Sequence, residues 1–199
     1  MPFADSTAPS LVTIVAGVPV AGSWWGHPAG QAVYRVGEAI ESDKDVLVVR
    51  LWRGKLTLVH RRLWPALLRV GGARADWQME GLSAGGRHLL SLVEKVGLLR
   101  SDALPPDFSP GYSVFRPALR DLERRLLVLT RSVHTPRGAH ALEAESWLAW
   151  RRRVRTPPFP GTWPSAQRRL EAAARFLQPG VEPRPFFPWG RSDGPGTPK

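Results

Sequence analysis

Apolar residues recur at three- and four-residue spacing in several separate stretches of this 199-residue chain. After Pro28, such a stripe consists of Val33, Val36 and Ile40, and it predicts an amphipathic helix that ends in "ESDKD". Further helices are expected where similar stripes follow a serine or proline and end near glycine or at an irregular stretch. These helices are predicted over residues 65–70, 84–96, 117–127, 146–153 and 165–177.

Shorter apolar runs predict strands. "VLVVRLW" and "KLTLVHR" flank Arg53-Gly54, which is typical of a β-hairpin. "LVLTRSVHT" (127–135) predicts a strand and "PRG" a tight turn, after which residues 139–146 are either a returning strand or the start of the last helix. Residues 11–22 are either a short strand or a buried approach segment, because their periodicity does not decide between them.

These elements predict an α+β protein with a sequential organisation. Residues 1–10 are expected to be disordered, residues 11–82 to form a small unit of helix, hairpin and helix, and residues 83–155 to form a second module. A linker and an amphipathic helix follow over 156–178. Proline and glycine dominate residues 179–199, which we expect to be a disordered tail.

The composition excludes several classes of protein. The chain has no cysteine, so it has no disulfide framework, thiolate metal site or cysteine nucleophile. No run of 18 apolar residues is present, and a membrane partner is not expected. The first ten residues lack the positive charge of a secretory signal and include Asp5, so we expect a cytoplasmic protein.

The formal net charge of +11 indicates a polyanionic partner. Four of the 28 basic residues are lysine and the others are arginine, whose planar fork of donors suits phosphates and guanine edges. A GC-rich genome also favours arginine over lysine, but it does not explain the net charge. Most of the positive excess lies in residues 151–199.

The segment "HLLSLVEKVGLLRSDAL", followed by "ALRDLERRLLVL" and two strands, resembles the winged helix-turn-helix family. The resemblance covers about residues 83–150, roughly a third of the chain. It implies that the first helix buries its leucines, that the arginine-bearing helix enters the major groove of DNA, and that the hairpin wing contacts the backbone or the minor groove. Such modules occur in bacterial regulators and in DNA-repair proteins.

The arginines of the expected recognition helix are the first candidate nucleic-acid-binding residues. Arg116, Arg120 and Arg124 are four residues apart and share one helix face, opposite the leucines. Arg125 stands beside them, and Arg137 is expected at the tip of the wing, where it can enter a narrow minor groove. The alternative is a solvated face on which these arginines pair with Asp121 and Glu123.

"HRRLWPAL" suggests a second nucleic-acid-binding surface. Lys55, Arg61 and Arg62 would contact phosphates there, and Trp64 would stack on a base. Alternatively, Trp52 and Trp64 pack against each other across the hairpin. A third stretch, "SWWGHPAG" (23–30), is interpreted as a hydrophobic plug ahead of the first helix rather than as a site.

Catalytic and metal-binding alternatives have weaker support. The sequence has no nucleophile elbow, P-loop or dinucleotide fingerprint. A magnesium-dependent nuclease would use the clustered carboxylates, and a zinc site would use His134 and His140 with Glu143 or Glu145. The carboxylates in question are Glu38, Glu41, Asp43 and Asp45. We expect both groups to be surface residues, with no catalytic residue, metal or cofactor.

The expected function is therefore non-catalytic DNA binding, in regulation or repair, with DNA as the partner. Two alternatives remain open at this point. One is a nucleic-acid-processing enzyme that uses the carboxylates or histidines, and the other is a protein–protein interaction module of the winged-helix type, which implies a protein partner.

Overall fold

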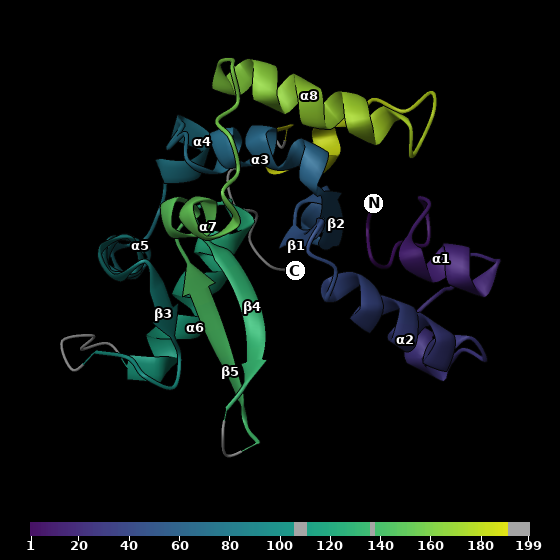
Figure 1. The fold of residues 1–199 in the computed structure, drawn as a ribbon, viewed down its shortest axis with the longest axis horizontal. Helices are drawn as coiled ribbons and strands as arrows, with labels where there is room; N and C mark the ends of the chain where they lie inside the picture. Colours follow the sequence, from purple (N-terminus) through teal and green to yellow (C-terminus); the bar gives the residue numbers. More distant parts are fainter. Residues whose placement is uncertain (106–110, 136–137, 191–199) are drawn as a thin grey trace. The chain divides into compact units, whose positions relative to one another are not determined.

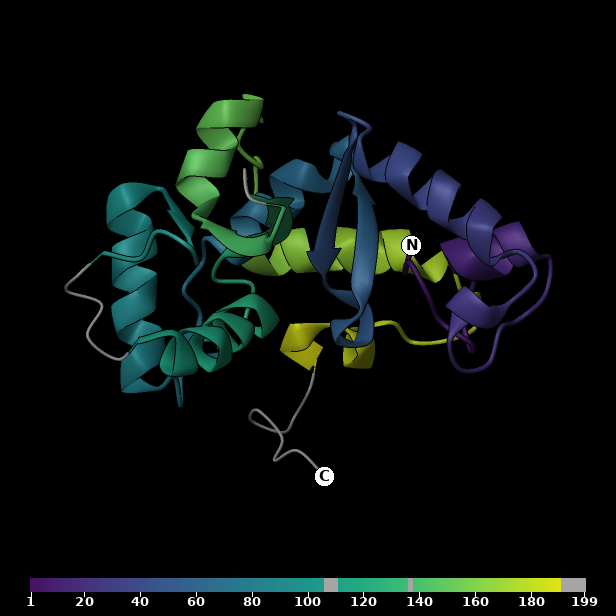
Figure 2. The ribbon, with the colours of Figure 1, turned by 90° about the horizontal axis from the view of Figure 1, so that it is seen from below.

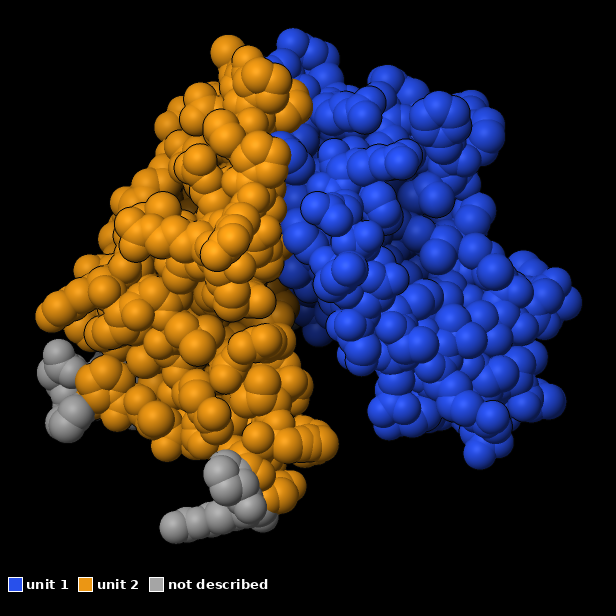
Figure 3. Space-filling model, in the orientation of Figure 1, with its two compact units in different colours: residues 1–67, 164–192 blue, residues 68–163, 193–199 orange. Residues whose placement is uncertain are grey.

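The computed structural model describes residues 1–105, 111–135 and 138–190. The chain forms two compact units, coloured separately in Figure 3. Among the described residues, the first unit combines residues 1–67 with 164–190, and the second is formed by residues 68–163. The mixture of helices and small antiparallel sheets confirms the α+β prediction. The division differs from the sequential modules expected from the sequence, because the first unit takes its residues from both ends of the chain.

The first unit is built around a two-stranded hairpin of β1 (Val46–Arg50) and β2 (Leu56–His60). Val46 pairs with His60 and Arg50 with Leu56, as the hairpin prediction requires. The turn passes through Arg53 and Gly54, which both have positive φ. The first unit also contains the helices α1 (Leu11–Ala16), α2 (Gly30–Glu41) and α8 (Trp163–Arg175). Helix α3 (Trp64–Gly71) leads from the first unit into the second. Figures 1 and 2 show these elements in two views.

The expected disorder of residues 1–10 is not observed. Pro2 forms a β-bridge with Thr57, and the Phe3 amide donates to the Leu56 carbonyl at 2.7 Å. Residues 11–22 do not form a strand: Ser10 caps the helix α1. Local composition missed this arrangement because the N-terminal segment gains its hydrogen bonds from a hairpin about fifty residues away.

The end of the described chain is also more ordered than expected. Two 3-10 turns, η4 (Arg184–Phe186) and η5 (Pro188–Gly190), follow α8. Phe187 and Trp189 are buried, and the Trp52 ring lies 4.8 Å from the Phe186 ring, measured between centroids. Aromatic residues thus anchor a segment whose proline and glycine content suggested a disordered tail; the expected tail beyond residue 190 lies outside the described residues.

The second unit contains four helices besides the end of α3 and one three-stranded sheet within its described residues. The helices are α4 (Asp76–Met79), α5 (Ala84–Val96), α6 (Gly111–Arg124) and α7 (Trp147–Val154). The strands are β3 (Leu98–Arg100), β4 (Leu129–His134) and β5 (His140–Glu145). The antiparallel sheet has the order β3-β5-β4, so β3 joins the β4–β5 hairpin as a third strand.

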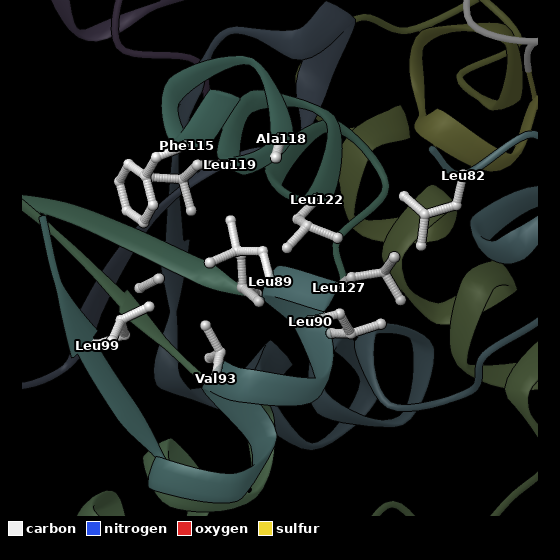
Figure 4. Packing of buried hydrophobic residues seen from close by; sticks show 12 residues of the cluster. Leu82, Leu89, Leu90, Val93, Leu99, Phe115, Ala118, Leu119, Leu122 and Leu127 are labelled. Atoms are coloured by element: carbon white, nitrogen blue, oxygen red, sulfur yellow. The ribbon is translucent and has the colours of Figure 1, made fainter. Parts of the chain in front are cut away.

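The core of the second unit lies between α5, α6 and the sheet. Leu89 and Val93 of α5 meet Leu119 and Leu122 of α6, as Figure 4 shows. Further buried members of the same cluster include Leu90, Leu99, Phe115, Leu127 and Ala144. Because both helices bury one leucine face in a common cluster, their opposite faces are left to solvent.

Several element boundaries can be compared with the predictions. Ser83 caps α5 through the Gly86 amide, and Gly97 ends it with a φ of 83°, both as predicted. Helix α6, by contrast, begins at Gly111, so Pro117 lies inside it rather than at its start. Residues 140–145 are a strand, and α7 follows Ser146 as its N-cap. None of the helices in the described ranges is both long and apolar enough to cross a membrane.

Candidate nucleic-acid interface

Helix α6 presents three arginines on the face opposite its buried leucines. Arg116, Arg120 and Arg124 are all exposed. Leu119 and Leu122 on the other side are almost completely buried. The 3.6-residue period therefore separates the charged and apolar faces as the sequence predicts, and the leucine face fixes how the arginines are directed.

The two acidic side chains of α6 have other partners. Asp121 accepts a hydrogen bond of 2.7 Å from the Arg125 Nε atom. Glu123 accepts one from the hydroxyl group of Thr130 on β4. Neither Arg120 nor Arg124 forms an ion pair within the described part of the chain. Arg120 and Arg124 are therefore not neutralised by the acidic residues of their own helix, which was the alternative to DNA binding.

Arg125, predicted to stand beside the other arginines, does not share this exposed face. Its side chain is buried, and Nη1 donates to the carbonyl oxygens of Gln78 at 3.1 Å and Glu80 at 2.7 Å. Helix α6 ends at Arg124, and the chain turns at Leu126 with a φ of 52°. The residue after the helix consequently points inward, where it holds α4 against the end of α6.

The expected wing is present as the β4–β5 hairpin, but Arg137 lies outside the described residues. The strand arginine Arg131 is bound to Glu143 at 2.5 Å. Near the end of the ladder, His134 and His140 are paired across the strands, with ring centroids 4.3 Å apart in an edge-on arrangement. The described part of the hairpin thus carries two adjacent histidine rings and an arginine that is paired with Glu143.

The zinc alternative requires a carboxylate next to these histidines. Glu143 is bound to Arg131, and Glu145 accepts two hydrogen bonds from Arg153, of 3.0 and 2.7 Å. No group of three or more histidine, aspartate or glutamate residues in the described ranges has an arrangement fit to hold a metal ion. Both glutamates instead stabilise the sheet and α7.

The carboxylates of residues 38–45 are engaged in local structure. Asp43 accepts a hydrogen bond from the Asp45 amide at 2.8 Å, and Asp45 is paired with Arg61 at 3.1 Å. Glu38 accepts a hydrogen bond of 2.7 Å from the hydroxyl group of Tyr34. These contacts are those of a helix end and a turn rather than of a shared magnesium site.

The second predicted surface is only partly formed. Lys55 is paired with Asp5 at 3.1 Å, and Arg61 is the partner of Asp45, while Arg62 is exposed. Trp64, expected to stack on a base, is buried, and its Nε1 atom donates to the Val59 carbonyl at 2.9 Å. The described contacts of Trp52 are with Phe186 and Phe187. The basic residues here therefore lack the aromatic platform that the prediction needed.

The two tryptophans of "SWWGHPAG" (23–30) differ in their burial. Trp24 is partly buried against Phe3, but Trp25 is 63% exposed, so the stretch is not simply a plug. The sequence signal for this exposed aromatic side chain was the pair of adjacent tryptophans between glycines. Comparison with models of known protein families, with curated proteins and with solved structures finds no match to this chain.

Proposed function

We propose that this protein binds duplex DNA, with α6 as the recognition helix and the β4–β5 hairpin as a wing. The observation that carries the proposal is the pair Arg120 and Arg124. Both are exposed on a helix whose opposite face is locked into the core, and both acids of that helix are engaged elsewhere. Two guanidinium groups are thus presented in a fixed direction without an internal counter-charge.

The arrangement of elements supports a winged-helix module. Helix α5, strand β3, helix α6 and the β4–β5 hairpin follow one another along the chain, and this succession includes the helix, the arginine-bearing helix and the two-stranded wing expected from the sequence. Strand β3 pairs with β5, and β5 with β4, so the hairpin is tied to the same core as α6. A helix and a hairpin held by one core can contact adjacent grooves of a duplex together.

The chemistry of recognition follows from the spacing. A separation of four residues places Arg120 and Arg124 about 6 Å apart along the helix axis. This is close to the rise of two base pairs, each of which adds about 3.4 Å along a strand. An arginine fork that meets the O6 and N7 atoms of guanine distinguishes this base from the others. We also propose that this DNA binding serves regulation or repair.

Titration of the protein with labelled duplexes tests the proposal. A preferred sequence is first selected from a random pool, and its affinity is measured by fluorescence anisotropy between about 50 and 200 mM salt. We expect the affinity to fall steeply with salt. Replacing Arg120 or Arg124 by alanine should reduce the preference for that sequence by about 1–3 kcal/mol for each base contact.

Arg152→Ala is the matched control, since Arg152 is an exposed arginine of α7 outside the proposed recognition helix. It should weaken binding to all sequences about equally, or not at all. Loss of preference in the control but not in the α6 variants would contradict the assignment of α6. Absence of binding at low salt would favour the protein-interaction alternative.

A further inference from the structure

The first unit contains a hollow beside helix α2 that the DNA-binding proposal does not use. Its volume is about 390 Å³. One wall is a single face of α2, with Tyr34, Gly37, Glu38 and Glu41 at helical spacing. The N-terminal segment, the tryptophan pair and the turn end of the hairpin form the rest. These parts contribute Phe3, Ala4, Trp24, Trp25, Arg50, Lys55 and Leu56.

Aromatic rings line this hollow in a continuous series. Trp24 and Trp25 are stacked with ring centroids 3.9 Å apart, and Trp25 is tilted against Tyr34 at 5.7 Å. Phe3 continues the series on the other side of Trp24, at 5.8 Å. A Cβ atom at Gly37 would lie 3.0 Å from the Phe3 ring, so the glycine lets this ring approach the helix closely.

The exposure of Trp25 is not accounted for by packing. Although 63% of its surface is open to solvent, the Trp25 ring is stacked on Trp24 and is tilted by 42° relative to the Tyr34 ring. A large aromatic side chain is costly to leave in water, and an exposed aromatic group at the rim of a cavity is typical of a ligand site. The aromatic series is thus a candidate binding wall.

The α2 wall of the hollow is acidic. Glu38 and Glu41 contribute carboxylates from α2, and neither forms an ion pair among the residues that the structure describes. The hydrogen bond to Glu38, the charge of Glu38, burial and the charge of Glu41 together raise the pKa of Tyr34. The two carboxylates therefore place negative charge on the α2 wall, whereas the positive lining residues Arg50 and Lys55 come from the hairpin.

The two basic residues of the lining are held by other groups. Lys55 is paired at 3.1 Å with Asp5, whose side chain is completely buried. An anion that drew Lys55 away would weaken the pairing of this buried carboxylate, which is costly. Arg50 donates to the Gly54 carbonyl at 3.3 Å. A phosphate or nucleotide in the hollow would also meet the repulsion of Glu38 and Glu41.

We propose that this hollow binds a quaternary ammonium group, which would lie against the faces of Trp25 and Tyr34 with Glu38 and Glu41 as counter-charges. Aromatic faces attract cations through their quadrupole. A quaternary ammonium has no N–H group, so it does not need the hydrogen-bond acceptors that an aromatic wall lacks. The volume is within the range of small-molecule sites. This inference is independent of the proposed DNA binding by α6.

Choline and its neutral carbon isostere, 3,3-dimethyl-1-butanol, are the probes that test this proposal. Isothermal titration calorimetry with the full chain should show saturable binding of choline, and the isostere should bind about 2- to 30-fold more weakly, the range expected for a cation–π contact. Equal binding of both compounds would overturn the proposal, because the hollow would then be merely apolar. Absence of saturable choline binding would overturn it as well.

Variants locate the binding site. Trp25→Ala and Glu41→Gln should weaken choline binding severalfold, and both replace exposed side chains. Phe176→Ala and Glu182→Gln are matched controls, because Phe176 is 89% exposed and Glu182 is an exposed acid outside the lining. Unchanged binding in the first pair, or an equal loss in both pairs, would place the ligand elsewhere and contradict the proposal.

The source of the ammonium group is resolved by three forms of the same headgroup. Free choline, a peptide with a trimethylated lysine, and phosphatidylcholine vesicles are compared for affinity and for competition with one another. Tightest binding of free choline assigns a soluble ligand, of the peptide a modified protein chain, and of vesicles a lipid headgroup. In each case, the Trp25→Ala variant should lose the interaction.

Discussion

Arg124 and Arg125 are adjacent and chemically identical, yet they have opposite environments. Arg124 is exposed on α6, whereas Arg125 is buried beneath the end of that helix and binds backbone carbonyl groups next to α4. The sequence "ERRLL" contains nothing that distinguishes them. The difference arises from the helix end and the positive φ of Leu126, which sequence periodicity does not reveal.

Replacing each of these arginines by methionine separates stability from binding. Arg125→Met should lower the free energy of unfolding by about 3–5 kcal/mol, because it leaves Asp121 and several carbonyl groups without their partner. Arg124→Met should change stability by less than about 0.5 kcal/mol. Chemical denaturation measures both values. Similar losses in the two variants would contradict the buried role of Arg125.

Asp5 is expected to contribute a pH-dependent part of the stability of the first unit. Burial alone would raise the pKa of Asp5, but hydrogen bonds from Thr7 and Lys55, with the charge of Lys55, outweigh this and lower the pKa. A lowered pKa means that the folded state favours the carboxylate. Its stabilisation is therefore complete above the unfolded pKa of about 3.9 and is lost as the pH falls through the folded pKa.

Comparison with Asp5→Asn tests this linkage. The difference in unfolding free energy between the wild-type chain and the variant should be largest near neutral pH and should shrink below about pH 4. Denaturation series at several pH values measure it. A difference that stays constant down to pH 3 would show that the charge of Asp5 is not the stabilising feature.

At the level of elements, local sequence signals were sufficient to predict a helix or hairpin whose ends or turn are set by residues of that element. Ser83 and Gly97 delimit α5, and Arg53-Gly54 marks the turn of the β1–β2 hairpin. Local signals failed at the N-terminal segment and at η4 and η5, whose partners are distant in sequence. For the candidate interface, helical spacing placed Arg120 and Arg124 correctly on one face, but it did not show the burial of Arg125 and Trp64.

The contact between α3 and α7 depends on a glycine. A Cβ atom at Gly71 would overlap the indole ring of Trp147, which is buried and donates from Nε1 to the Leu126 carbonyl at 2.7 Å. Gly71→Ala should therefore destabilise the protein by about 1–3 kcal/mol through overpacking. At the neighbouring Gly72, the nearest atom is the Leu68 carbonyl oxygen at 3.3 Å. Thermal denaturation compares the two variants, and Gly72→Ala should lower the midpoint of unfolding less than Gly71→Ala. Equal shifts of the midpoint in both variants would contradict the close packing at Gly71.

On the scale of the whole molecule, the chain leaves the first unit after residue 67 and returns to it at residue 164. No local pattern in the sequence announces this return. It depends on the contacts of Trp52 with Phe186 and Phe187, which are more than a hundred residues away. The sequential modules expected from the sequence do not include this return of the chain to the first unit.

Phe187→Ala tests this division of the molecule. Phe187 is buried and stacks on Trp189 with ring centroids 4.6 Å apart, so its truncation should cost about 3–5 kcal/mol. Hydrogen exchange read by mass spectrometry should show reduced protection in β1 and β2. Protection of β4 and β5 should remain close to that of the wild-type chain. A uniform loss across both sheets would indicate a single cooperative unit instead.

The discontinuity of the first unit also has a consequence for the order of events on the ribosome. Domains usually fold from the N-terminus during synthesis, at about 5–20 residues added per second. Here, residues 68–163 of the second unit are synthesised before residues 164–190, which complete the described part of the first unit. Trp52 therefore lacks the aromatic residues that cover it for about 7–27 s of translation, until Phe186 and Phe187 are added. The unit that is started first is finished last, and the nascent hairpin is the segment that chaperones would meet exposed.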